Sequence, residues 1–249
     1  MFRNFFSPMP ILTAAFGVTA AMMTLSAQPA AAAGIFTPPA GCTLEITVQN
    51  RSCTVSQHYR CTADQAGDQR VTIFTPDGPV YESRIDVETR WMQSRNLLSG
   101  LADTLVDDSP DHASFSTLLD SGRDDFDFWT VSNTGERLHH VGHDILTGET
   151  TEISGVALEV TQFDLKTYSE SGDLLIHRQG SQFISRAHGR FYGGTEKSTD
   201  WTGNAVEDND TPVRFAFPGQ PGFGDTTPQY DCDLQMVRAS DPLQSGAKL

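Results

Sequence analysis

Apolar and polar residues alternate in short runs from Cys42 onwards. Alternation with a period of two is typical of strands that have one buried face. Residues 42–49 and 54–59 show it on either side of a short polar segment, and residues 69–75 and 80–90 show it on either side of a Pro-Asp-Gly-Pro turn. The pattern therefore predicts two successive hairpins.

The pattern becomes helical between residues 93 and 121. The first part of this stretch carries apolar residues at the spacing of one helix face, namely Leu97, Leu98, Leu101 and Leu105. The second part opens with a Ser-Pro-Asp cap signal at Ser109 and stops at Gly122. We therefore expect an insertion of two short helices.

Strand patterning returns after this insertion. The predicted strands cover residues 126–132, 137–146, 156–169, 173–185, 189–194, 213–217 and 231–237. No helical segment lies between them to return the chain in parallel, so neighbouring strands should be antiparallel. The predicted fold is mainly β: a curved antiparallel meander, a barrel or half-barrel of about ten strands, with the short two-helix insertion near residues 93–121.

The N-terminal residues have the parts of an export signal: Arg3, an apolar segment over residues 9–25, and small residues up to Ala33. We expect residues 1–33 to be a signal peptide that is cleaved after Ala33, and no stable membrane anchor. The rest should comprise a lead-in over residues 34–41, one β-rich domain over 42–238 and a disordered tail over 239–249. This organisation predicts a protein of the periplasm, or a secreted protein, of a Gram-negative-type bacterium.

The chain has 4 cysteines, an even number that indicates disulfides in an exported protein. If Gln49 faces Thr54 across the first hairpin, counting outward along both strands places Cys42 opposite Cys61. Two bridges are therefore predicted, Cys42–Cys61 and Cys53–Cys232. The second would close the sheet through its last strand.

The composition is acidic. Lys and Arg number 17 and Asp and Glu 32, which gives a formal charge of −15. Removal of residues 1–33 takes away Arg3 and no acid, so the mature chain would carry −15 − 1 = −16. Because no basic stripe offsets this charge, we expect neither nucleic acid nor anionic lipid headgroups as partners.

Three histidines and an aspartate lie close together in the sequence, at His139, His140, His143 and Asp144. On a helix His139 and His143 would share a face, as in zinc sites, but this stretch has the pattern of a strand. Four residues of a strand span roughly 13 Å, too far for two imidazoles to share one ion. We therefore expect no metal and no cofactor, and keep these four residues as the alternative, a metal-dependent or general acid/base hydrolase site.

Large apolar side chains on alternate positions of curved strands point to one concave face, where they can line a ligand cavity. Three basic residues also alternate along the strand that ends near residue 194, and they could receive an acidic ligand group or pair with neighbouring carboxylates. The candidate ligand-binding residues are Phe128, Phe163, Phe183, Arg186, His188 and Arg190.

The favoured hypothesis is an exported, soluble periplasmic binding or envelope-maintenance protein that holds an apolar or amphipathic, lipid-like ligand in the concavity. The chain has no nucleophile elbow, phosphate loop or dinucleotide motif, so no catalytic residue is assigned and an enzyme is the less favoured class. A structural or interaction protein with a filled core is the third hypothesis. An aromatic-lined cavity would favour the first, convergent histidines and carboxylates the second, and a solid core the third.

Overall fold

The computed structural model describes residues 34–233, and the statements below refer to this part of the chain. Its first strands are β1 (Cys42–Asn50), β2 (Thr54–Cys61), β3 (Gln69–Thr75), β4 (Gly78–Ile85), β5 (Trp91–Asn96) and β6 (Ala102–Leu105). One helix, α1 (Phe115–Ser121), follows. The remaining strands are β7 (Arg123–Ser132), β8 (Arg137–Ile153), β9 (Val156–Ser169), β10 (Leu174–Ser185), β11 (Arg190–Asp200), β12 (Ala205–Asn209) and β13 (Pro212–Ala216).

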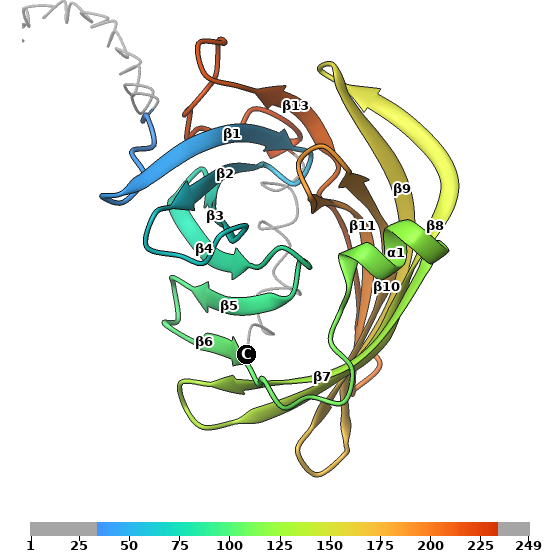
Figure 1. Cartoon of the computed structure of the whole chain (residues 1–249). Helices are drawn as coiled ribbons and strands as arrows, with labels where there is room; N and C mark the ends of the chain where they lie inside the picture. The colour runs from blue at the N-terminus through green and yellow to red at the C-terminus, as the bar shows by residue number, and fades with distance from the viewer. Residues whose placement is uncertain (1–33, 234–249) are drawn as a thin grey trace, which may run out of the picture. The chain divides into compact units, whose positions relative to one another are not determined.

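All of these strands form one 13-stranded sheet (Figure 1). Strands β1 to β12 each pair with the next strand in the sequence, and β13 returns to pair with β1. The pairs are antiparallel throughout, and the open edges are β12 and β13. The predicted mainly β meander is confirmed, with thirteen strands rather than about ten and without closure of the sheet.

The first half of the predicted two-helix insertion is wrong. Strands β5 and β6 occupy the leucine-rich stretch, and a tight turn joins them. In that turn the Asn96 side chain accepts the N–H groups of Leu98 and Ser99, and the Asn96 N–H donates to the Leu101 carbonyl. Leu97, Leu98 and Leu101 therefore lie in a hairpin turn and not on one face of a helix. Leu98 is 78% exposed.

The second predicted helix exists as α1 but starts later than expected. Its N-cap is Ser114, whose hydroxyl oxygen accepts the Thr117 N–H. The predicted cap Ser109 instead lies in the preceding loop, where its hydroxyl donates to the Val106 carbonyl. Gly122 ends the helix as predicted, at a φ of 80° that few residues other than glycine adopt.

The two predicted disulfides are both present: Cys42–Cys61 and Cys53–Cys232. The predicted register of the first hairpin is wrong near its turn, where Asn50 rather than Gln49 pairs with Thr54. A bulge at Glu45 removes this offset further along the hairpin. Cys42 and Cys61 therefore face each other, because the one-residue shift at the turn and the bulge at Glu45 cancel.

The second bridge ties the segment after β13 to the turn of the first hairpin. Next to it the Cys53 N–H donates to the Tyr230 carbonyl over 3.1 Å. The predicted strand over residues 231–237 lies largely outside the described residues, and its described start is not a strand. The strand that pairs with β1 is β13 instead.

The hydrophobic core has two clusters. The first, which we call the closure cluster, consists of Ile46, Val48, Val156, Leu158, Tyr192 and Phe215. It brings β1 and β13 against β9 and β11, so the sheet curls back on itself there. The second, which we call the cavity cluster, consists of Leu105, Phe126, Phe128, Phe163 and Leu165.

The link between β12 and β13 joins the two edges of the sheet. The Asp210 N–H donates to the Gly194 carbonyl of β11, and the Arg51 N–H, in the turn after β1, donates to the Thr211 carbonyl. Asp210 thus bonds to β11, the neighbour of edge strand β12, and Thr211 bonds to the turn after β1, the neighbour of edge strand β13. The ladder of strands remains open, but the chain bridges its edges at this corner.

Candidate ligand-binding cavity

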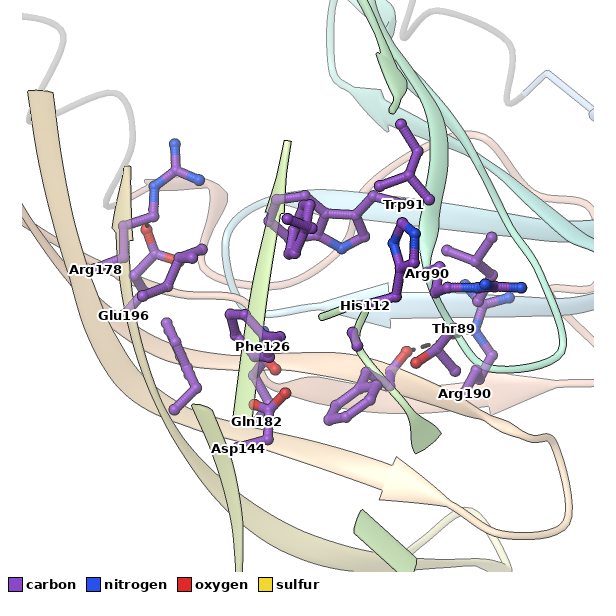
Figure 2. A pocket seen from close by; sticks show the side chains of 17 residues that line it. Thr89, Arg90, Trp91, His112, Phe126, Asp144, Arg178, Gln182, Arg190 and Glu196 are labelled. Atoms are coloured by element: carbon purple, nitrogen blue, oxygen red, sulfur yellow. Dashed lines mark hydrogen bonds and ion pairs between the residues drawn. The ribbon is translucent and has the colours of Figure 1, made fainter. Parts of the chain in front are cut away.

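A cavity of about 230 Å³ lies against the cavity cluster. Its apolar wall includes Trp91, Leu105, Phe126, Phe128, Phe163 and Leu165. Its polar groups include Asp144, Arg178, Gln182, Arg190 and Glu196. Figure 2 shows Arg178 and Glu196 on one side of Trp91 and Phe126, and Arg190 on the other. A mostly apolar wall with a few charged groups is the composition of small-molecule sites.

The aromatic wall follows from alternation along β7. Phe126 and Phe128 lie two positions apart and therefore share a face, opposite Gly142 and His140 of β8. A β-carbon at Gly142 would lie 2.8 Å from the Phe126 ring and 2.1 Å from the Asp164 carbonyl oxygen. Glycine is required here because the ring lies directly over the strand.

His140 belongs to this aromatic wall as a neutral side chain. Its ring stacks on Phe128 with centroids 4.9 Å apart, and its two nitrogens bind the hydroxyls of Thr130 and Thr167 at 3.0 and 3.1 Å. Burial lowers the pKa of His140 to about 4, with nearby Arg178 acting in the same direction. The wall therefore carries no charge at neutral pH.

Trp91 is the most exposed member of the apolar wall. Its ring meets Phe128 edge-on at 5.7 Å, yet the residue is 44% exposed. A large apolar side chain that faces a cavity and stays solvent-accessible is a common feature of binding sites. The exposed part of the Trp91 side chain is thus available to contact a ligand.

Arg178 and Glu196 form an ion pair on one side of the cavity, with nitrogen and oxygen 3.6 Å apart. The two side chains are 39% and 37% exposed. Because solvent screens such a pair, it contributes little to stability. Glu196 is, however, the counter-ion of Arg178, so the charge of Arg178 is already neutralised within the protein.

Arg190 lies on the other side and is buried, with 6% exposure. Its Nη1 donates to the Gln69 side-chain oxygen over 3.3 Å, and its guanidinium lies 5.5 Å from the centroid of the Tyr192 ring. Burial lowers the pKa of Arg190 to about 10, so the group is still a cation at neutral pH. No carboxylate of the described residues forms an ion pair with it.

A buried carboxyl group, Asp124, and a half-buried one, Asp144, are paired across β7 and β8. Burial raises the pKa of Asp144 to about 7, and the nearby Asp124 carboxylate adds to this shift. Burial also raises the pKa of Asp124 to about 6, although the Ser114 N–H donates to its Oδ2 over 2.8 Å and opposes the shift. Asp144 therefore lines the cavity as a carboxyl that titrates near neutral pH.

The six candidate ligand-binding residues do not lie together in the structure. Phe128, Phe163 and Arg190 line the cavity, whereas Phe183 packs against the closure cluster. The expectation that Arg186 and His188 lie on a strand is wrong, because both belong to the turn between β10 and β11. There Arg186 pairs with Glu159, and the His188 ring binds the Tyr192 hydroxyl at 2.8 Å.

The residues of the alternative hydrolase site lie on both faces of β8. His139 and His143 share one face, and His140 and Asp144 share the other. His139 lies outside the cavity lining and binds Asp127 over 2.6 Å, and His143 is opposite Asp125 and Asp164. Within residues 34–233 no group of three or more His, Cys, Asp or Glu side chains is placed to hold a metal ion. The structure therefore does not bring His139, His140, His143 and Asp144 into one site.

Sequence reasoning missed several cavity residues: Trp91, Leu105, Phe126, Leu165, Arg178 and Glu196. Phe126 and Leu165 could have been found, because they lie two positions from Phe128 and Phe163 and share their faces. Trp91 and Leu105 could not, since Trp91 lies between the second predicted hairpin and the predicted insertion, and Leu105 lies in a stretch predicted to be helical.

Comparisons with protein-family models, with curated proteins and with solved structures give no match to this chain. Among the described residues, no helix has the length and apolar character needed to cross a membrane. Function is therefore inferred from the cavity and its chemistry.

Proposed function

We propose that this protein is an exported binding or envelope-maintenance protein that holds a small apolar or amphipathic ligand in the cavity. The observation that carries the proposal is the aromatic wall, in which Trp91 stays exposed beside a cavity of about 230 Å³. Binding would cover this apolar surface and so be favoured by the hydrophobic effect.

The size of the cavity limits the ligand. Its volume of about 230 Å³ is below the ~300–1,000 Å³ of sites for drug-sized molecules. A single aliphatic chain or a small aromatic compound fits this space better than a complete two-chain lipid. We therefore expect a ligand with one apolar part.

Export remains part of the proposal. The two disulfides are compatible with an oxidising compartment, and the predicted signal peptide lies outside the described residues. Intact-mass measurement of protein from the periplasm should give a chain that starts at or near Gly34. A full-length species retained in the membrane would contradict export.

The two alternative functions have less support. The hydrolase hypothesis needs its histidines and Asp144 together beside the bound substrate, but only Asp144 of these four lines the cavity, and both ring nitrogens of His140 bind threonine hydroxyls. A structural protein with a filled core has no use for a cavity with an exposed tryptophan. Neither alternative accounts for Trp91.

The test is titration with N-phenyl-1-naphthylamine, a neutral apolar probe. The wild-type protein should bind it, and Ala113→Phe should abolish binding because the new ring enters the cavity that Ala113 lines. The matched control Ala187→Phe places the same ring in the exposed turn after β10 and should leave binding unchanged. Absence of probe binding, or equal binding by Ala113→Phe, would refute the proposal.

A further inference from the structure

Arg190 differs from the other arginines of the described chain. Most of them pair with a carboxylate. Of the rest, Arg95 is exposed and Arg214 donates to the Pro221 carbonyl. Arg190 is buried, faces the cavity and pairs with no carboxylate among residues 34–233. Buried charges in proteins are normally paired, so this cation needs an explanation.

The acids that could neutralise Arg190 are engaged elsewhere. Glu45, whose charge acts on Arg190, accepts a hydrogen bond of 3.0 Å from Arg60, and Glu196, on the other side of the cavity (Figure 2), pairs with Arg178. The partners that Arg190 does have are neutral: the Gln69 side-chain oxygen, the Phe191 carbonyl and the face of the Tyr192 ring. The protein itself therefore leaves the charge of Arg190 without a counter-ion.

Hydrogen bonds fix the position of the Gln69 side chain, which contacts Arg190. Its side-chain nitrogen donates to the carbonyls of His188 and Gly189 at 3.1 and 2.9 Å. These bonds fix the amide so that its oxygen faces the Nη1 of Arg190. The guanidinium is therefore held through Nη1 and Nε, which donate to Gln69 and to the Phe191 carbonyl, while Nη2 has no acceptor among the described residues.

The histidines around Arg190 do not compete with it for an anion. The His58 ring is buried against Tyr192 at a centroid distance of 5.5 Å, and its two nitrogens lack hydrogen-bond partners within the described chain. Burial and the positive charge of Arg190 lower the pKa of both His58 and His188. Arg90 also lines this side of the cavity (Figure 2), but its guanidinium is paired with Asp86. Arg190 thus provides the unpaired positive charge on its side of the cavity.

We propose that the ligand of the cavity carries a carboxylate and that this group binds Arg190, with the apolar part of the ligand lying along the aromatic wall. This inference rests on the proposed function. A guanidinium binds a carboxylate through two parallel N–H···O bonds, and such a bond is stronger in a buried site. A single unpaired cation matches a singly charged carboxylate better than a doubly charged phosphate.

The experiment compares ligands that share one apolar chain. Decanoate, decan-1-ol and decyl phosphate compete with N-phenyl-1-naphthylamine for the full-length mature protein at pH 7.5. Decanoate should bind at least tenfold more tightly than decan-1-ol and more tightly than decyl phosphate. Preference for decyl phosphate would overturn the assignment to carboxylates, and equal binding of decanoate and decan-1-ol would overturn the role of Arg190.

The variant Arg190→Met tests the residue itself. It should lower decanoate affinity at least tenfold and leave decan-1-ol affinity unchanged. The control Arg186→Met removes an exposed arginine from the adjacent turn and should change neither affinity. Equal loss of both ligands in Arg190→Met would mean that Arg190 only supports the fold, and would overturn the inference.

A second variant keeps the test valid if Arg190→Met does not fold. Arg190→Lys retains the charge but loses the planar pair of donors, so decanoate affinity should fall several-fold while decan-1-ol affinity stays the same. An unchanged preference for decanoate would overturn the inference. If the wild-type protein binds neither the neutral probe nor decan-1-ol, the proposed function itself fails, and this result differs from loss of the decanoate preference alone.

Discussion

The two hydrophobic clusters of the sheet differ in how completely they are filled. In the closure cluster Val48, Leu158 and Phe215 are 0%, 1% and 2% exposed, whereas Phe126 and Phe163 of the cavity cluster are each 8% exposed. The closure cluster receives side chains from β1 and β13 on one side and from β9 and β11 on the other. One continuous sheet thus has a solid part that holds the curl and an incompletely filled part that can bind.

The cavity cluster stays open because of its neighbours. Arg190 and Asp144 line the same space, and charged or polar groups that lose water without a partner cost free energy. The aromatic side chains therefore cannot collapse onto them without a penalty. The predictions below test this difference between a solid and an open cluster.

The largest expected effect is loss of the Cys53–Cys232 bridge, which encloses a sequence separation of 179 residues. In the chain-entropy model the double variant Cys53→Ala/Cys232→Ala should lose on the order of 5 kcal/mol of unfolding free energy. The variant without Cys42–Cys61, with a separation of 19 residues, should lose on the order of 3 kcal/mol. Urea unfolding measures both, and a larger loss for the short bridge would contradict this order.

Truncation of one phenylalanine in each cluster compares them directly. Phe215→Ala should cost about 3–5 kcal/mol of unfolding free energy, because a fully packed ring leaves a new cavity. Phe163→Ala should cost about half as much, since its ring already borders an empty space and makes fewer contacts. The measurement is the urea midpoint of each variant. Equal losses would show that the cavity cluster is as solid as the closure cluster.

Asp144→Asn tests the polar side of the cavity. The folded-state pKa of about 7 is above the unfolded value, so the contribution of Asp144 to stability is fully present below pH 4 and is lost as the pH rises through 7. The variant should therefore be more stable than the wild type at pH 8, by about 2 kcal/mol, and equally stable at pH 4. Thermal unfolding across this range measures the difference.

The expected gain at pH 8 is smaller than the full shift of the pKa implies, because Asp124 shares the charge repulsion. The exposed control Asp173→Asn should show no such pH dependence. A wild-type protein whose stability rises between pH 5 and pH 8 relative to Asp144→Asn would contradict the assignment.

The smallest effect is expected outside both clusters, at His139 and His143. The pair of His139 with Asp127 is partly solvent-exposed, so the double alanine variant should lose less than about 1 kcal/mol. Metal content measured by mass spectrometry should be the same for both proteins. One equivalent of zinc in the wild type that is absent from the variant would restore the hydrolase hypothesis.

Most strands of this fold were predictable from alternation, although β5, β6 and β12 were not, and the cavity was predictable only in part. Phe128 and Phe163 were found because the period of two fixes their face. Leu101 and Leu105 suggested a helix, since a hairpin turn of five residues can imitate helical spacing; what decides the matter is the hydrogen bonding of Asn96.

Local irregularities limited the rest of the prediction. The bulge at Glu45 changes the register of the first hairpin, and the turn that begins after Ser185 takes Arg186 and His188 out of the strand that carries Arg190. Such features depend on contacts between distant strands and leave no periodic signal in the sequence. For the same reason the orientation of Trp91 toward Phe128 could not be derived from its neighbours in the chain.

The measurement that tests the central claim most directly is energy transfer from Trp91 to N-phenyl-1-naphthylamine. The chain has 3 tryptophans, of which Trp91 lines the cavity and Trp201 is exposed in the turn before β12. Trp129, which follows the cavity residue Phe128 on β7, is replaced by Phe in all the proteins compared. If the cavity is the binding site, Trp91→Phe should then remove most of the energy transfer to bound probe, and Trp201→Phe should leave it nearly unchanged. Transfer that survives Trp91→Phe and disappears in Trp201→Phe would place the probe elsewhere and contradict a ligand in the cavity.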